Sequence, residues 1–317
     1  MSFGTRRVRA TLVHNPTAGD RQAAAGLVAK LEQADYEVTY HSKRSEELEV
    51  ALADPGELVI VAGGDGTVAK VAAAIAGRDI PLAILPVGTA NNIARSLGLV
   101  GGWGHIVAGL RSAPRKRLDI GVARGPWGER RFVEAAGIGL FARAVALLND
   151  WEVQPVAELV KDEPNFETAL RLLRHLVNDY SPRQWRVTLD GRDLSGRYLL
   201  LEAMIIRLIG PHLHLAPDAD PGDGLFDVVL VSEDQAEALL RYLGHRLERE
   251  ATLPALTVHR GRRLELLWTE PEIHFDDEAW TKNAAGPLAG RPAGAATNPT
   301  VQLDVGEEWV DVLVPGP

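Results

Sequence analysis

The chain has 317 residues, of which 46% are hydrophobic, 24% are charged and 6% are aromatic. This composition allows one large or two ordinary globular domains and excludes a disordered chain, which could not contain so much apolar material. The 43 acidic residues outnumber the 34 basic ones, which argues against a nucleic-acid partner, and the lack of cysteine excludes disulfides and thiolate metal sites.

The first third of the chain alternates strand-like and helix-like segments. Most of the strand-like runs are continuously apolar, which is typical of strands buried on both faces of a parallel sheet. The segments between them repeat their apolar residues at helical spacing. We expect strands at 8–14, 36–40, 58–62 and 82–85, and helices at 21–34, 45–53, 68–76 and from 90 onward. This order predicts a parallel sheet with crossover helices, the α/β class.

From about residue 117 the pattern changes to short alternating strands separated by turn residues, which indicates an antiparallel sandwich. Strands are expected at 118–123, 131–136, 185–189, 198–207, 225–231 and 264–268, and helices at 166–177 and 233–247. We therefore predict an α/β plus all-β architecture, with an α/β domain at 1–122 and a β-sandwich domain with inserted helices at 123–317. The stretch 281–300 is rich in Ala, Gly and Pro and is expected to be a mobile loop. The last strand could pack back on the first domain.

The strongest chemical signal is the glycine-rich turn between the strand at 58–62 and the helix that follows. It contains Gly63, Gly64, Asp65, Gly66 and Thr67. Glycines let backbone amides approach an anion closely, and the start of the next helix presents free amides and a positive dipole to phosphate. Because an aspartate does not bind phosphate itself, Asp65 would meet Mg²⁺ or a hydroxyl. The alternative is a tight turn in which Asp65 only caps the helix.

Two further loops follow strands in the same way, at 15–19 and at 86–92. The carboxyl ends of parallel strands are where open α/β sheets bind ligands, so we expect all three loops at one site. Neither a Walker A sequence nor Gly-x-Gly-x-x-Gly occurs in the chain, which disfavours a P-loop and a dinucleotide-binding Rossmann site.

In this order and spacing, NPTAG at 15–19, GGDGT at 63–67 and PVGTANNIAR at 86–95 resemble the diacylglycerol kinase catalytic-domain family, which includes bacterial lipid kinases, sphingosine kinases and ceramide kinases. RLDIG at 117–121 and PDADPGDGLFD at 217–227 extend the resemblance over nearly the whole chain. It implies a nucleotide-binding α/β domain, a β-sandwich and an active site between them. GGDGT is shared with NAD kinases and 6-phosphofructokinases, so this motif by itself indicates phosphoryl transfer without naming the acceptor.

The resemblance also implies roles for individual residues in binding ATP and Mg²⁺ and in catalysis. The residues expected to bind ATP or to lie near it are Asn15, Gly63, Gly64, Asp65, Gly66, Thr67, Gly88, Thr89, Asn92 and Asp119, the last in the polar network beneath the catalytic metal. Asp223, with backbone carbonyls around it, would hold a Mg²⁺ that stabilises the second domain. Glu278 would be the general base, with Asp276 and Asp65 as the other catalytic carboxylates.

Three positions depart from the family pattern. Asn92 stands where many members carry Asp, which removes a negative charge from the metal network. Asp277 replaces the Gly of Asp-Gly-Glu, so the turn before Glu278 loses a residue that readily adopts positive φ. Residues 207–212 replace a glycine-rich run ahead of the metal loop. The nucleotide half of the site is therefore the firmer inference.

The leading hypothesis is an ATP- and Mg²⁺-dependent kinase that phosphorylates a hydroxyl of a lipid such as diacylglycerol. The alternatives are an NAD kinase-like or other small-alcohol kinase, and a nucleotide-binding regulator without catalysis. No apolar run approaches the roughly 18–20 residues of a membrane span, and no signal-peptide pattern opens the chain. We therefore expect a cytoplasmic protein of phospholipid biosynthesis; transient contact with a membrane surface and a homodimer are both compatible with this hypothesis.

Two arginines, Arg171 and Arg174, flank the apolar stripe of the expected helix at 166–177. Arginines at such positions are usually solvated, so a surface position is the default interpretation. The alternative is that they reach across to ATP.

Overall fold

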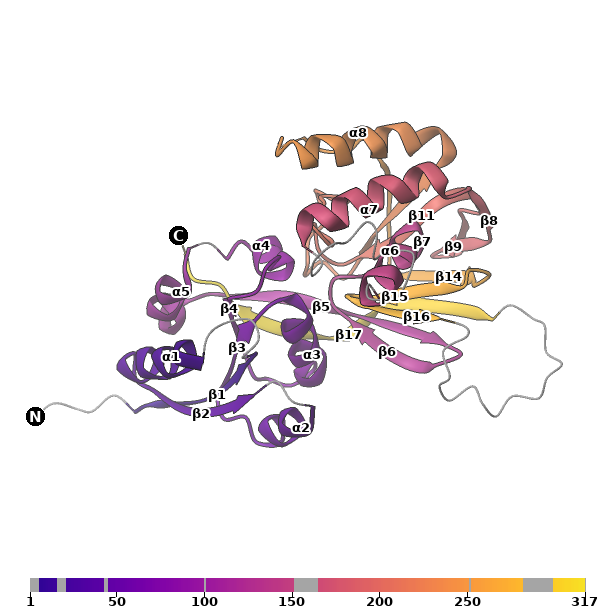
Figure 1. Cartoon of the computed structure of the whole chain (residues 1–317). Coiled ribbons are helices and arrows are strands. Elements are labelled where there is room, and N and C mark those ends of the chain that lie inside the picture. Colours follow the sequence, from indigo (N-terminus) through magenta and orange to yellow (C-terminus); the bar gives the residue numbers. More distant parts are fainter. Residues whose placement is uncertain are drawn as a thin grey trace, which may run out of the picture. The chain divides into compact units, whose positions relative to one another are not determined.

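The computed structural model describes residues 6–15, 21–42, 45–99, 101–150, 165–250, 252–281 and 299–316. The chain divides into two compact units (Figure 1). Unit 1 contains residues 1–120, 221–223 and 307–317, and unit 2 contains residues 121–220 and 224–306. The strands β5 (Arg115–Gly125) and β17 (Thr300–Leu313) each begin in one unit and end in the other. Of the expected mobile loop at 281–300, residues 282–298 lie outside the described residues.

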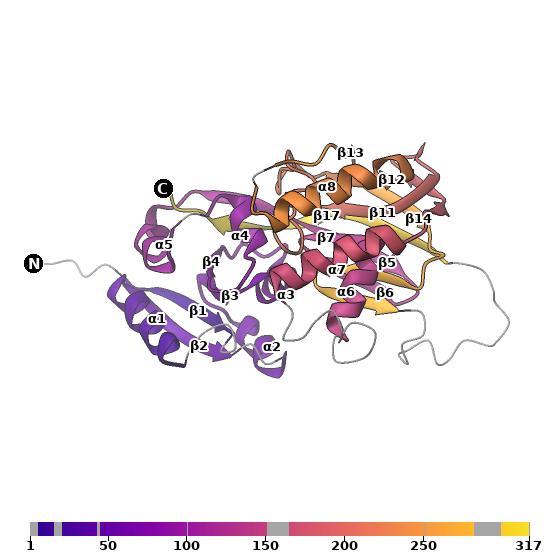
Figure 2. The ribbon, with the colours of Figure 1, turned by 45° about the horizontal axis from the view of Figure 1, so that its top comes forward.

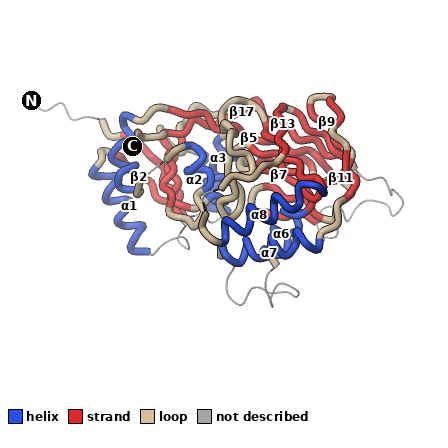
Figure 3. Tube along the Cα trace, turned by 90° about the horizontal axis from the view of Figure 1, so that it is seen from above, coloured by secondary structure: helices blue, strands red, loops and turns tan. Residues whose placement is uncertain are grey.

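Unit 1 is a parallel sheet in the strand order β2-β1-β3-β4-β17, to which β17 contributes Val312 and Leu313. Its other strands are β1 (Val8–His14), β2 (Tyr36–Ser42), β3 (Leu58–Gly63) and β4 (Leu82–Pro86). Its helices are α1 (Arg21–Gln33), α2 (Ser45–Ala53), α3 (Asp65–Ile75), α4 (Asn92–Leu97), α5 (Trp103–Gly109) and the short η2 (Leu110–Ser112). Helices cover both faces of the sheet, with α1 and α5 on one side and α2 and α3 on the other (Figure 1, Figure 3).

The burial of β3 explains its composition. All of its residues, LVIVAG, are buried because β1 and β4 lie beside it and helices cover both faces. The chain goes from β1 outward to β2 and then returns to β3 on the other side of β1. The strand order therefore reverses between β1 and β3, and ligands bind at the carboxyl ends of the strands at such a point.

Unit 2 is built from antiparallel strands in two sheets. One sheet has the order β10-β9-β14-β17, with β5 paired to β17 and to β6. The other has the order β13-β12-β11-β7-β15-β16, with β8 paired to β11. The strands are β6 (Gly128–Phe132), β7 (Ala135–Gly139), β8 (Arg183–Trp185), β9 (Val187–Leu189), β10 (Arg192–Asp193), β11 (Gly196–Met204), β12 (Phe226–Ser232), β13 (Thr257–Gly261), β14 (Arg263–Leu267), β15 (Glu272–Phe275) and β16 (Glu278–Thr281).

Three helices, α6 (Leu140–Asn149), α7 (Phe166–Asp179) and α8 (Ala236–Leu247), complete unit 2, with the short η4 (Glu233–Gln235) ahead of α8. The helices α7 and α8 run side by side (Figure 2). The amphipathic α7 buries Leu170, Leu173 and Val177 in one core with residues of β7, β11 and α8. A second core is aromatic: Trp127 lies edge-on to Phe275 at a centroid distance of 5.0 Å and to Trp280 at 5.1 Å.

The structure confirms the predicted fold class, a parallel α/β unit followed by an antiparallel one. Several expected elements are corrected. The helix α3 begins at Asp65 rather than at Val68, so the end of the glycine motif forms its first turn. The expected strand at 131–136 is two strands in different sheets, β6 and β7, and the strand at 185–189 is likewise divided into β8 and β9. Buried and exposed residues can go on alternating where the chain passes from one sheet to the other. The hydrophobic pattern therefore did not separate β6 from β7 or β8 from β9.

Several elements of the structure were not expected from the sequence, among them α5, α6 and β16. No helix among the described residues is long and apolar enough to span a membrane.

Candidate active site

Three loops meet at the carboxyl ends of β1, β3 and β4. The N–H of Asn15 donates to the carbonyl of Ala62 at 3.0 Å, and the N–H of Val87 donates to the carbonyl of Gly63 at 3.3 Å. Backbone hydrogen bonds therefore hold the three strand ends side by side. Of the predicted NPTAG motif only Asn15 can be placed, because residues 16–19 lie outside the described residues.

The second and third loops contact each other through two glycines. A Cβ on Gly88 would overlap the Cα of Gly64, and a Cβ on Gly64 would lie 3.3 Å from the Cα of Gly88. Residue 88 therefore has no room for a side chain, and residue 64 has little. The two backbones pack directly against each other, so this part of the site is lined by backbone atoms.

The first turn of α3 is not capped by a side chain. Gly64 is its N-cap residue and has no side-chain oxygen to accept from the amides of the turn. Such a helix start attracts anions through its amides and its dipole. Thr67 is 3% exposed and packs on Gly63, where an added Cβ would lie 2.8 Å from the Cβ of Thr67. The structure thus gives Thr67 a packing role, and its contact with ATP stays a prediction, as does that of Gly66.

Asp65 holds the third loop in place. Its Oδ1 accepts the N–H of Ile93 at 2.9 Å, so Asp65 caps the start of α4, whereas the N-cap residue of its own helix is Gly64. The alternative that Asp65 caps the helix that follows the motif is therefore wrong. Burial raises the pKa of the Asp65 carboxyl, and the backbone amides of Ile93, Asn92 and Asn91 oppose the rise. A role of Asp65 toward Mg²⁺ or a hydroxyl stays a prediction.

Asn91 fixes the third loop, and the sequence analysis did not single it out. It has a left-handed backbone, with φ of 54°. Its side chain accepts the N–H of Gly88 at 3.1 Å and donates to the carbonyl of Gly88 at 2.8 Å. Asparagine tolerates positive φ and bonds to nearby backbone, so Asn-Asn after a glycine was an available signal. Of the predicted neighbours, Asn92 is buried and Thr89 is exposed.

The predicted metal loop lies against the start of β5. The N–H of Asp119 donates to the carbonyl of Pro221 at 2.7 Å, and a Cβ on Gly222 would lie 2.6 Å from the carbonyl oxygen of Arg117. Asp119 is 1% exposed and accepts from the Nε of Arg117 at 2.5 Å. The carboxylate of Asp119 is therefore paired with a guanidinium beside the loop that carries Asp223.

The loop at 217–227 carries Asp218, Asp220, Asp223 and Asp227, of which Asp223 is the predicted magnesium ligand. Asp223 is exposed, and in the described parts of the chain no group of three or more His, Asp or Glu side chains could hold a metal ion. A Mg²⁺ at Asp223 would therefore draw its other ligands from backbone carbonyls and water, which are oxygen donors that Mg²⁺ accepts. The residues fit a weakly held ion.

Asp276 lies in the two-residue turn between β15 and β16. Its carboxylate accepts the N–H of Val133 at 3.0 Å and the N–H of Glu134 at 2.7 Å, and its own N–H donates to the carbonyl of Ala135 at 2.9 Å. The residue is partly exposed, but protein surrounds its carboxylate. Burial raises the pKa of Asp276 to about 6, against the opposing effect of these amides. Asp276 therefore ties the hairpin to the connection between β6 and β7, while its catalytic role stays a prediction.

Positive φ occurs in this turn at Asp276, with φ of 52°, and not at Asp277. The expectation that Asp277 occupies the position that favours glycine is therefore wrong. The unfavourable backbone conformation falls on Asp276, where the hydrogen bonds of its carboxylate and N–H offset the cost.

Glu278 begins β16 opposite Phe275. Its Oε2 accepts from the guanidinium of Arg130 at 2.9 Å, and Arg130 also lies over the ring of Phe275, 5.4 Å from the centroid. The side chains of Arg130 and Glu278 are 33% and 44% exposed, so water reaches the pair. Exposed ion pairs contribute little to stability, so a ligand can replace Arg130 at low cost. The sequence did not indicate Arg130, because 148 residues separate it from Glu278.

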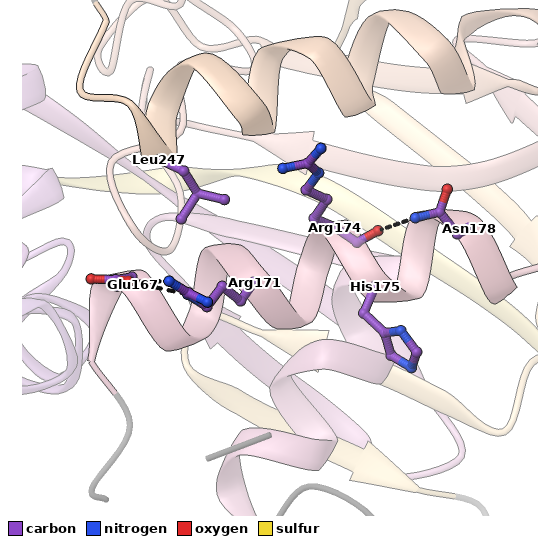
Figure 4. A pocket seen from close by; sticks show the side chains of 6 residues that line it. All are labelled: Glu167, Arg171, Arg174, His175, Asn178 and Leu247. Carbon is purple, nitrogen blue, oxygen red and sulfur yellow. Dashed lines mark hydrogen bonds and ion pairs between the residues drawn. The ribbon is translucent and has the colours of Figure 1, made fainter. Parts of the chain in front are cut away.

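A groove of about 370 Å³ lies along α7 beside the last residue of α8 (Figure 4). Its lining residues are Glu167, Arg171, Arg174, His175, Asn178 and Leu247. Arg171 pairs with Glu167 at 2.6 Å, and His175 lies 3.2 Å from Asp179. Arg174 has no carboxylate partner among the described residues. Both predicted arginines are exposed on α7, in agreement with the default interpretation.

Comparison with known proteins identifies two domains in this chain. Residues 9–123 match the model of the diacylglycerol kinase catalytic domain, and residues 150–290 match the model of the YegS C-terminal NAD kinase beta sandwich-like domain. The first match assigns residues 9–123 to the diacylglycerol kinase catalytic-domain family. This confirms the resemblance carried by GGDGT and the loops around it, all of which lie within the first match.

Individual relatives agree with this assignment. The diacylglycerol kinase of Bacillus subtilis (strain 168) is 26% identical over 255 residues, which are 74% of this chain and 77% of that protein. The diacylglycerol kinase of Mycobacterium tuberculosis (strain ATCC 25618 / H37Rv) is 29% identical over 279 residues, which are 79% and 84% of the two chains. The crystal structure of a diacylglycerol kinase from Bacillus anthracis str. Sterne matches over 99% of both chains, with a TM-score of 0.67 at 19% identity, and this likeness concerns the fold.

Proposed function

We propose that this protein is a lipid kinase that transfers a phosphoryl group from ATP to the hydroxyl of a lipid such as diacylglycerol. The observation that carries the proposal is the uncapped start of α3 beside the contact of Gly64 with Gly88. A phosphate chain needs backbone donors, a positive helix end and space free of side chains, and this place supplies all three. The match to this family, and relatives named diacylglycerol kinase, make a lipid hydroxyl the first acceptor to test.

In this proposal unit 1 binds the nucleotide. The backbone of 63–67 and of Gly88 surrounds the phosphates, with Asn15 and Thr89 at the border of the site. Asp65 keeps the third loop closed by capping α4. Bound Mg²⁺ supplies charge neutralisation on the phosphates, and Asp223 is the proposed ligand of a second, structural ion. Catalysis then consists mostly of positioning and electrostatic stabilisation.

Glu278 of unit 2 is the proposed general base. A carboxylate within hydrogen-bond reach of the lipid hydroxyl can accept its proton as the phosphoryl group is transferred. Arg130 donates to the Oε2 of Glu278 in the structure, and a carboxylate has further acceptor positions, so the hydroxyl can bind Glu278 beside Arg130 or in its place. Because the pair is open to water, replacing Arg130 costs little free energy.

A lipid acceptor entails further proposals. Its hydroxyl lies at the surface of a membrane, so the enzyme has to approach that surface from the cytoplasm and act there transiently. The exposed Arg174 on α7 suits contact with anionic headgroups, each basic residue contributing about 1 kcal/mol. A homodimer is compatible with the proposal and is not required by it.

The test is a transfer assay with γ-labelled ATP and diacylglycerol in detergent micelles, with sphingosine, NAD and glycerol as alternative acceptors. We expect label in the lipid product, only when Mg²⁺ is present, and far less label with the Glu278→Gln enzyme. Transfer to NAD instead would favour an NAD kinase-like enzyme. Binding of ATP without transfer to any acceptor would favour the non-catalytic regulator.

A further inference from the structure

Two buried titratable side chains, Glu202 and His274, have no part in the proposed catalytic machinery. Both are 0% exposed, and the Nε2 of His274 lies 2.7 Å from the Oε2 of Glu202. A buried pair of this kind costs desolvation free energy, so it is weak evidence for stability.

The pair bridges three neighbouring strands. Glu202 on β11 and His274 on β15 are both register partners of Gly137, on β7 between them. Two strand spacings, about 10 Å, separate the two backbones. The side chains meet above Gly137, where an added Cβ would overlap the carboxylate of Glu202. Glycine at 137 therefore leaves the space in which the bridge forms.

The other nitrogen of the imidazole contacts the turn that precedes Glu278. The Nδ1 of His274 lies 3.0 Å from the backbone carbonyl oxygen of Asp276. A carbonyl oxygen only accepts hydrogen bonds, so Nδ1 carries a hydrogen and donates it, while Nε2 faces Glu202. Burial alone would lower the pKa of His274, but Glu202 and this carbonyl outweigh it, so the pKa of His274 is raised. The bridge therefore sets the orientation of the ring toward the turn.

With the hydrogen bond from His274, every polar group of Asp276 has a hydrogen-bond partner. Its N–H donates to Ala135, its carboxylate accepts from Val133 and Glu134, and its carbonyl accepts from His274. Its φ of 52° is a conformation that residues other than glycine rarely adopt. Such a backbone persists only where its surroundings hold it. Loss of the hydrogen bond from His274 would free the carbonyl of Asp276. Glu278, the first residue of β16, lies two residues further along the chain.

We propose that Glu202 and His274 are positioning residues: they hold the carbonyl of Asp276 and thereby the direction in which β16 presents Glu278. The pair acts through the turn and through no contact with a substrate. The inference rests on the proposed function, in which Glu278 is the base.

The test separates the two bonds of the imidazole. In His274→Asn the amide nitrogen lies near the place of Nδ1 and can still donate to Asp276. In His274→Gln it lies near the place of Nε2 and cannot. Both are made together with Glu202→Gln, so that neither variant buries an unpaired carboxylate. We expect the Asn variant to keep most of its kcat with diacylglycerol, and the Gln variant to lose on the order of 10–100-fold, the effect of misplacing a catalytic group. The KM for ATP should be unchanged in both.

A second comparison tests whether the loss of kcat in the His274→Gln variant depends on Glu278. In a Glu278→Gln background, exchanging Asn for Gln at 274 should make no further difference to kcat, because residues that act as a unit are not additive. Equal kcat in the Asn and Gln variants, or a loss that adds in full to that of Glu278→Gln, would overturn the inference and leave the proposed base intact. Full turnover of Glu278→Gln alone would overturn the base and, with it, the inference.

A measurement on the unmodified protein covers the case in which the variants do not fold. In ¹⁵N NMR spectra, Nδ1 of His274 should carry a slowly exchanging hydrogen in the native enzyme. An unprotonated Nδ1 would contradict the bond to Asp276 and overturn the inference.

Discussion

In unit 1 the proposed phosphate site consists of backbone, held by neighbouring strand ends and by the contact of Gly64 with Gly88. In unit 2 the hairpin that carries Glu278 is held by side chains: Asp276 bonds to Glu134, 142 residues away, and Glu278 to Arg130, 148 residues away. A site made of backbone depends on having no side chains at a few positions, and one added atom can block it. A site made of side-chain bonds depends on several separate contacts, so single changes should weaken it by degrees.

The largest effect on ATP affinity should come from a side chain in the backbone site. Gly64→Val would place atoms against Gly88 and, in the proposed site, over the phosphates. Losing two charge-assisted hydrogen bonds at about 1.5 kcal/mol each predicts a fall in ATP affinity on the order of 100-fold, measured by titration calorimetry. Gly104→Val is the control, because a Cβ there meets no atom within 4 Å. Unchanged ATP affinity in a folded Gly64→Val protein would show that the motif is only a turn.

Glu278→Gln tests the residue of unit 2 that we propose as the general base. The amide keeps the size of the carboxylate but cannot take a proton, so turnover should fall by roughly 10²–10⁴ with ATP affinity little changed. Glu265→Gln, at an exposed position of β14, is the matched control and should keep full turnover. If Glu278→Gln retains most of its turnover, the role of base moves to Asp65.

Asp276 should make stability depend on pH. Its pKa is raised from 3.8 to about 6, so between these values the folded protein holds a proton that the unfolded chain has lost. Stability therefore falls as pH rises from about 4 to 6, by on the order of 3 kcal/mol from this group. Asp276→Asn should remove this part of the dependence in urea unfolding at a series of pH values. If the free energy of unfolding of the wild type and of Asp276→Asn changes with pH in the same way, the raised pKa of Asp276 is contradicted.

A smaller effect is expected at the metal loop. If Asp223 binds Mg²⁺ in the folded state only, Mg²⁺ at about ten times its Kd stabilises the protein by about 1.4 kcal/mol, or a few degrees in Tm. Asp223→Ala should abolish this response, whereas Asp218→Ala, at an exposed position of the same region, should keep it. A wild-type Tm that ignores both Mg²⁺ and EDTA would remove the structural ion from the proposal.

The smallest effect should be that of Arg174→Ala on membrane contact. Binding to vesicles that contain anionic lipid should weaken about fivefold, which corresponds to about 1 kcal/mol for one basic residue near the surface. Arg241→Ala is the control, because Arg241 on α8 pairs with Glu237 at 2.6 Å. Equal binding of both variants would exclude the groove of α7 as the contact surface.

The sequence predicted the backbone site better than the side-chain site. The three loops follow strands whose apolar runs are visible locally, and parallel strands bring their carboxyl ends to one edge wherever the sheet forms. The role of Asp65 was not predicted, because its partner Ile93 is 28 residues away. The sequence analysis expected positive φ at Asp277, whereas the structure has it at Asp276. Hydrogen bonds from Val133, Glu134 and His274 hold that conformation, and the first two of these residues are more than 140 positions away in the chain.

By itself the sequence determined most of the alternation of strands and helices in unit 1, the fold class and the position of the three loops proposed to bind phosphate, because each follows from residues close together in the chain. Only the tertiary structure decided that Glu202 and His274 meet above Gly137, and that Arg130 reaches Glu278. The physical reason is strand register: a shift of one residue turns every side chain to the other face of the sheet. Contacts between strands far apart in the chain therefore exist only once the order and register of the whole sheet are set.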